Sequence, residues 1–204
     1  MNTTRHLKAT FAAALLALAG SMSAHAATPG SVVKFGMVRS AALNAVPACV
    51  PNAKATVKIT PGGITETMNV SVSGLPANTD FDFFVIQVPA APFGLSWYQG
   101  DIETDAWGNG TAKFVGRFSQ ETFIVAPGVA SAPLTEPGDA SSNPATGPIQ
   151  TYHLGLWFNS PADAVAAGCP GTVTPFNGEH DAGIQVLNTS NFPDLQGPLL
   201  KVKP

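Results

Sequence analysis

The chain has 204 residues, 45% hydrophobic and only 11% charged, with 13 acidic against 10 basic side chains and a formal net charge of −3. This length is enough for one domain with a substantial core. The Lys and Arg residues are scattered along the sequence and form no run. Because nucleic acids and anionic lipid surfaces are bound by clustered basic side chains, the sequence disfavours both as partners.

Residues 1–26 are predicted to be a cleavable signal peptide. Arg5 and Lys8 make a positive start, and the apolar run that follows has about ten residues, whereas a membrane-spanning helix needs about 20. Ala24-His25-Ala26 provides the small-x-small cleavage pattern. Cleavage there leaves residues 27–204, with 8 basic and 13 acidic side chains and a charge of −5. We therefore expect a secreted or periplasmic protein without membrane insertion after cleavage; an N-terminal membrane anchor is the alternative.

The two cysteines, Cys49 and Cys169, are predicted to form one disulfide. In an oxidising compartment an even number of cysteines is most simply paired. A bond between them closes a loop of about 120 residues, which the chain-entropy model values at about 4–5 kcal/mol. The close Cys-x-x-Cys spacing typical of redox and metal sites does not occur in the sequence.

Apolar residues recur at every second position over much of the mature chain, and helical periodicity is nearly absent. In residues 64–73, for example, Ile64, Met68 and Val70 share one face and polar residues occupy the other, which is typical of a half-buried strand. Further strands are predicted at residues 57–60, 81–88, 95–104, 112–118, 121–126, 151–158, 183–189 and 199–203. About eight short strands favour an all-β, antiparallel sandwich in a single domain of residues 27–204.

Two segments are predicted to interrupt this pattern. Residues 126–150 contain five prolines, which cannot donate to a central strand ladder, so we expect a long Pro-rich surface loop. An interdomain linker is the alternative, but only 54 residues follow it.

In residues 151–158, alternation places His153 and Trp157 on the solvent-facing side. A short helix is then predicted, with Ser160 as its N-cap.

One part of the sequence resembles a known architecture. Residues 70–79, Val-Ser-Val-Ser-Gly-Leu-Pro-Ala-Asn-Thr, lead into Phe-Asp-Phe-Phe-Val-Ile-Gln at residues 81–87. Residues 104–110, Thr-Asp-Ala-Trp-Gly-Asn-Gly, precede Phe114. These motifs, covering about 50 residues, resemble exported bacterial immunoglobulin-like β-sandwich domains. The resemblance implies that fold and carries no activity, because such sandwiches host many functions.

A calcium site is one chemical hypothesis. Asp101, Glu103 and Asp105 stand at alternate positions in an acidic segment, as oxygen ligands do in calcium loops. The segment has Ala106 and Ala112 where an EF-hand loop requires Gly and Glu. The alternative is a solvated turn without a metal ion, and we expect no other cofactor.

The two histidines of the mature chain, His153 and His180, are candidates for hydrolytic or metal chemistry. His180 has an acidic residue on each side, and with His153 nearby it would complete a site of two histidines and a carboxylate. The two lack a fixed spacing, and the Gly-x-Ser-x-Gly motif of serine hydrolases is absent from the sequence. A surface loop is the alternative interpretation.

Aromatic side chains give the preferred hypothesis. Trp97, Tyr98, Trp107 and Trp157 lie on predicted strands and turns, where exposed rings can stack on sugars or anchor a protein. They can equally pack beneath a loop. We therefore predict a non-catalytic secreted protein that binds an unidentified glycan or protein. The alternatives are a secreted hydrolase that uses carboxylates or His180, and a structural component of the envelope or matrix.

Overall fold

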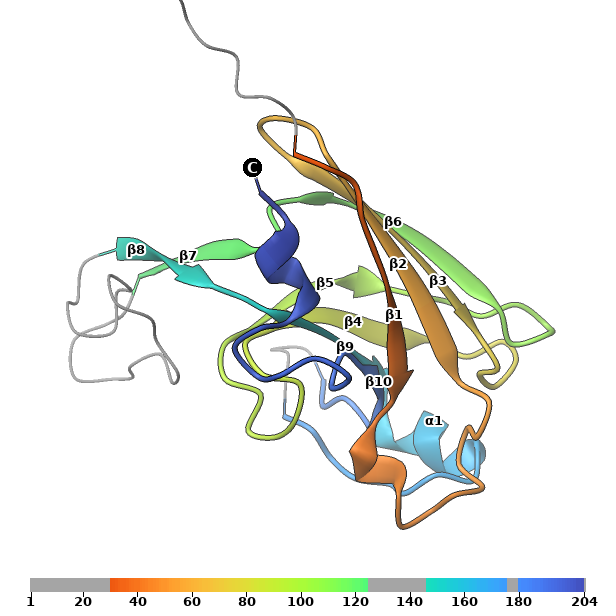
Figure 1. Cartoon of the computed structure of the whole chain (residues 1–204). Helices are drawn as coiled ribbons and strands as arrows, with labels where there is room; N and C mark the ends of the chain where they lie inside the picture. Colours follow the sequence, from red (N-terminus) through yellow and green to blue (C-terminus); the bar gives the residue numbers. More distant parts are fainter. Residues whose placement is uncertain (1–29, 125–145, 176–179, 204) are drawn as a thin grey trace, which may run out of the picture.

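The computed structural model describes residues 30–124, 146–175 and 180–203 (Figure 1). The predicted signal peptide lies outside the described residues, as does most of the predicted Pro-rich loop. Within the described part, antiparallel strands predominate. Their bounds are β1 Val33–Arg39, β2 Lys54–Pro61, β3 Glu66–Ser73, β4 Phe81–Ile86, β5 Ser96–Asp101, β6 Gly110–Gly116, β7 Gln120–Ile124, β8 Thr146–Gln150, β9 His153–Phe158 and β10 Gln185–Asn188. The helices are α1, Pro161–Ala166, and the 3-10 turns η1, Ala41–Leu43, and η3, Pro198–Lys201.

Eight strands form one curled sheet in the order β5-β4-β9-β10-β1-β2-β3-β6. Strand β1 joins two halves, since Val33–Met37 pair with β2, whereas Val38 and Arg39 pair with β10. The halves pack against each other, and the rings of Phe83 on β4 and Phe114 on β6 stack at 5.3 Å. The all-β, antiparallel prediction is therefore confirmed, in the form of a continuous sheet whose edge strands β5 and β6 approach each other (Figure 1).

Period-two alternation explains the main core. On β2 and β3, the inward side chains Val57, Ile59, Met68 and Val70 are almost fully buried, and their sequence neighbours face solvent. The prediction for Ile64 is wrong, because this residue lies in the turn before β3 and is 85% exposed. A turn residue is not held by the strand ladder, so the period of two does not extend to it.

The predicted exposure of His153 and Trp157 is wrong. Every side chain of β9 is buried, and these two are 0% exposed. The reason is that other parts of the chain cover the outer face of β4 and β9. Trp157 packs edge-on against Phe84 at 5.4 Å and Phe93 at 5.0 Å, in a second small apolar cluster. Alternation correctly separated the two faces, but both of them are buried.

The helix and the disulfide are confirmed. Helix α1 begins at Pro161, and the hydroxyl of its N-cap Ser160 accepts a hydrogen bond from the backbone amide of Asp163 at 3.1 Å. Three residues after the helix, Cys169 is bonded to Cys49, with 5.0 Å between their Cα atoms. No helix among the described residues is long and apolar enough to cross a membrane.

Two other predictions need correction. Residues 146–150 of the predicted loop form strand β8, which pairs with β7 in a separate ribbon that projects from the sheet (Figure 1). A two-stranded ribbon consists of edge strands only, and edge strands accommodate a proline such as Pro148. The predicted last strand, at residues 199–203, is instead the 3-10 turn η3, whose Leu199 amide is bonded to the carbonyl of Tyr152.

Candidate functional site

Carboxylates gather on the outer face of strands β4 and β5. On β4, Phe81 and Phe83 face the main core, so the intervening Asp82 faces the other side of the sheet. The pairing of β4 with β5 places Asp101 directly opposite Asp82. We call the group of Asp80, Asp82 and Asp101, with Tyr98 and His180 at its rim, the acidic site.

Asp82 is the unusual member of the acidic site. Its side chain is only 1% exposed, and neither carboxylate oxygen has a hydrogen-bond partner among the described residues. The imidazole of His180 lies beside it, with Nε2 3.9 Å from Oδ2 of Asp82 and 2.8 Å from Oδ1 of Asn159. A buried carboxylate without hydrogen bonds is energetically unfavourable in its charged form.

The surroundings shift the protonation of Asp82. Burial raises its pKa from 3.8 to about 7, a direction that His180 opposes and that the charge of Asp101 reinforces. The pKa of Asp80 is raised in the same way, first by burial and then by Asp101. At neutral pH, Asp82 is therefore present in both protonation states, and its protonated form can donate a hydrogen bond to Asp101.

Tyr98 orients Asp101, the exposed carboxylate that lies opposite Asp82. Its hydroxyl donates a short hydrogen bond to Oδ1 of Asp101, and its ring packs on Phe84 with 5.4 Å between centroids. Burial and the bond to Asp101 raise the pKa of the Tyr98 hydroxyl. The phenol thus remains a donor at physiological pH and orients the Asp101 carboxylate, while 41% of Tyr98 stays open to solvent.

The four aromatic residues predicted as a ligand surface are not brought together. Trp107 is 82% exposed, as expected for its turn, and Trp97 is 49% exposed. Trp97 and Tyr98 are consecutive on β5, so they project from opposite faces of the sheet. Trp157 is buried. Of the exposed rings only Tyr98 belongs to the acidic site, whereas the buried Trp157 lies directly opposite Asp82 in the pairing of β4 with β9.

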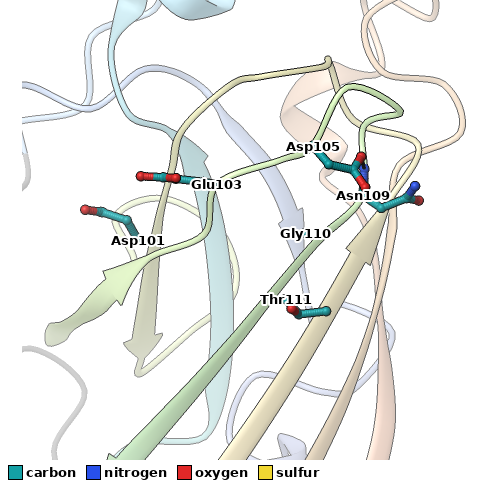
Figure 2. Close-up of a pocket in the computed structure, with 6 residues that line it drawn as sticks. All are labelled: Asp101, Glu103, Asp105, Asn109, Gly110 and Thr111. Atoms are coloured by element: carbon teal, nitrogen blue, oxygen red, sulfur yellow. Dashed lines mark hydrogen bonds between the residues drawn. The ribbon is translucent and has the colours of Figure 1, made fainter.

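The three residues of the calcium hypothesis line one open hollow but are not clustered around a common point. Figure 2 shows Asp101 and Glu103 extending together from the end of β5, whereas Asp105 lies in the turn beside Asn109. Oδ1 of Asp105 accepts hydrogen bonds from the backbone amides of Trp107 and Asn109, both at 2.9 Å. These bonds, first of all the one from Asn109, lower the pKa of Asp105. Over the described ranges, no three acidic, His or Cys side chains are placed to hold a metal ion.

The two histidines are also separate. His153 is bonded through Nδ1 to the hydroxyl of Thr189 at 2.9 Å and through Nε2 to the carbonyl of Asp194 at 2.7 Å. Burial lowers its pKa, so it serves as a neutral core residue. His153 pairs across the sheet with Ile86, four positions from Asp82, which is about 13 Å along the strand. Of the two, only His180 contributes to the acidic site.

Asp82 and Asp80 were not among the site residues predicted from the sequence. The available signal was the run Phe-Asp-Phe-Phe-Val-Ile-Gln-Val at residues 81–88, in which Asp82 is the only charged residue. A charge within a strand that is apolar on both faces is a recognised mark of a special environment. The sequence does not reveal the site, because Asp101 lies 19 positions from Asp82 and is brought opposite it only by the pairing of β4 with β5.

The acidic site can attract cations and accept hydrogen bonds. Asp101 and Glu103 are exposed, Asp82 is buried beside them, and the ring of Tyr98 offers an aromatic face. No protein-family model matches the chain, and no curated protein matches it in sequence.

Proposed function

We propose that this protein is a secreted, non-catalytic binding protein whose acidic site receives a positively charged Lys or Arg side chain of a protein partner. The observation that carries the proposal is the buried carboxylate of Asp82, which receives no hydrogen bond from a donor among the described residues and faces the carboxyl of Asp101. Such a group destabilises the fold when ionised, and groups of this kind concentrate at functional sites. Secretion is supported by the N-terminal sequence and by the Cys49–Cys169 disulfide.

The mechanism uses the coupling between the two carboxylates. Burial is the main cause of the raised pKa of Asp82, and the charge of Asp101 adds to it; a cation that docks on the exposed Asp101 neutralises that added contribution. Asp82 then loses its proton, and its negative charge strengthens the attraction for the cation. The open face of Tyr98 adds a cation–π contact. Binding near pH 7 is therefore accompanied by release of a proton.

The test uses a neutral peptide with a single Arg and the matching peptide with Gln in its place. Isothermal titration at pH 7, in two buffers of different ionisation enthalpy, measures affinity and the protons released. We expect binding of the Arg peptide alone, with proton release, and loss of binding in Asp101→Asn. Asp194→Asn, which removes an exposed carboxylate outside the site, should bind normally. Equal binding by both variants, or no preference for Arg, would refute the proposal.

A secreted hydrolase is the second candidate. A carboxyl group with a raised pKa next to an ionised carboxylate is the arrangement of a general acid and its partner. The 1% exposure of Asp82 argues against this use, because a general acid must reach its substrate. Activity on glycoside or peptide substrates that disappears in Asp82→Asn would favour the hydrolase.

Two finer interpretations remain proposals. An immunoglobulin-like sandwich is supported by the packing of the two halves of the sheet, with Phe83 stacked on Phe114. A structural component that assembles through open sheet edges has weaker support, because the edge strands β5 and β6 approach each other.

A further inference from the structure

Lysines gather on the exposed face of strands β1, β2, β3 and β6. The register places Lys34 opposite Lys58, Lys58 opposite Asn69, and Asn69 opposite Lys113. Directly paired residues of antiparallel strands point to the same side of the sheet, and these four are all exposed. They form one row across four strands, on a surface that we call the lysine face.

The row is dense in space although its members are distant in sequence. Neighbouring strands lie about 4.8 Å apart, so Lys34 and Lys113 are separated by about 14 Å, with Lys58 between them. Lys54 lies on the same face of β2, about 13 Å along the strand from Lys58. Strand pairing thus brings together basic residues that are scattered in the sequence. The lack of a basic run in the sequence therefore does not argue against a polyanionic ligand at this face.

The lysines of the lysine face have no acidic partner on their own strands, and the carboxylates of Asp101, Glu103 and Asp105 line a hollow at its edge beside Thr111. Glu66 is the one acidic residue in these four strands, and it points inward with 1% exposure. Its carboxylate is bonded to the guanidinium of Arg117 at 3.3 Å and to the amide of Phe118 at 2.9 Å. Within the part of the chain that the structure describes, no ion pair involves a lysine of this face.

The face also has the shape and hydrogen-bonding groups for a polar chain. A shallow depression runs over β1, β2 and β3, and its polar lining consists of Lys34, Thr56, Lys58, Asn69 and Ser71. Hydroxyl and amide groups therefore alternate with ammonium groups.

Its aromatic residues are turned away. Phe35 and Phe114, on β1 and β6, are half-buried and pack against the main core. Proteins that bind single-stranded nucleic acid present exposed rings on which bases stack. The half-buried Phe35 is the one ring that lines the depression, and none of the four strands presents a fully exposed ring. The ammonium, hydroxyl and amide groups of the face match a ligand with acidic groups and many hydroxyls.

We propose that the lysine face binds an acidic polysaccharide, laid across β1, β2, β3 and β6. Lys34, Lys58 and Lys113 pair with the carboxylates of the polymer. Thr56, Asn69 and Ser71 form hydrogen bonds with its sugar hydroxyls. This proposal does not depend on the acidic site, because the two sites consist of different residues.

The test measures binding of the mature, disulfide-bonded protein to polygalacturonate, with neutral dextran and short single-stranded DNA as comparison ligands. We expect binding to polygalacturonate that weakens as salt rises, no binding to dextran, and DNA binding at least about tenfold weaker. Lys34→Gln/Lys58→Gln should weaken binding about tenfold, because two ion pairs are lost. Lys201→Gln/Lys203→Gln removes the same charge outside the row and should change affinity less than about threefold.

Several results would overturn the proposal. Equal weakening in both variants would mean that only total charge matters, and equal affinity for DNA would mean a general polyanion surface. Sedimentation of the free protein tests a second copy as the occupant: self-association that Lys34→Gln/Lys58→Gln abolishes would assign the face to that contact. Because the substituted lysines are exposed, both variants should melt within a few degrees of the natural protein, which excludes misfolding as the cause.

Discussion

Replacing Asp82 with Asn should stabilise this protein at alkaline pH. In the folded state burial raises the pKa of Asp82 to about 7, against 3.8 for an ordinary aspartate. A group with a raised folded-state pKa stabilises the fold when protonated, so its contribution is complete below about pH 4 and is lost as the pH rises through 7. The difference of about 3 pH units corresponds to about 4 kcal/mol lost by pH 8.

The variant removes this loss but introduces a buried amide. The NH2 group of this amide can donate to Asp101, but its oxygen has no donor among the described residues. A buried polar atom without a partner costs about 1–3 kcal/mol, so Asp82→Asn should gain about 1–3 kcal/mol at pH 8 and be no more stable than the natural protein at pH 4. With about 2–4 °C per kcal/mol for a domain of this size, its melting temperature at pH 8 should rise by about 2–12 °C.

Urea unfolding at several pH values between 4 and 8 measures the effect. His153 titrates with the opposite sign, because its lowered pKa makes folding less favourable in acid. It is present in both proteins, so the difference between them at each pH isolates Asp82. Asp101→Asn should move the pH dependence to lower values, since the charge of Asp101 raises the pKa of Asp82. Parallel stability curves for the natural protein and Asp82→Asn would show that Asp82 does not titrate in this range.

Three further predictions concern the fold. Trp157→Ala should cost about 3–5 kcal/mol in urea unfolding because the ring is fully buried, whereas Trp107→Ala should stay within about 0.5 kcal/mol; similar costs would contradict the assigned burial. Replacing Cys49 and Cys169 with Ser should lower stability by about 2–5 kcal/mol, and thiol titration of the unfolded natural protein should detect no free thiol. Gly108→Ala should lower the melting temperature, because φ is +74° and a Cβ would clash with the carbonyl oxygen of Leu75; an unchanged value would refute this strain.

Local features of the fold could be predicted from the sequence. Alternating residues such as Val57 and Ile59 identified β2, because a strand repeats every two positions whatever surrounds it. Ser160 and the proline after it identified the start of α1, because capping uses neighbouring groups. The disulfide followed from the presence of only two cysteines.

The candidate sites depended on tertiary structure. The sequence separates the two faces of β9 but does not show that distant segments cover the outer one, so His153 and Trp157 were expected in solvent and are buried. Likewise, Asp82 meets Asp101, and Lys34 meets Lys58, only through the register of paired strands. Periodicity is a property of each segment, whereas burial and the grouping of charges depend on which other segments pack beside it.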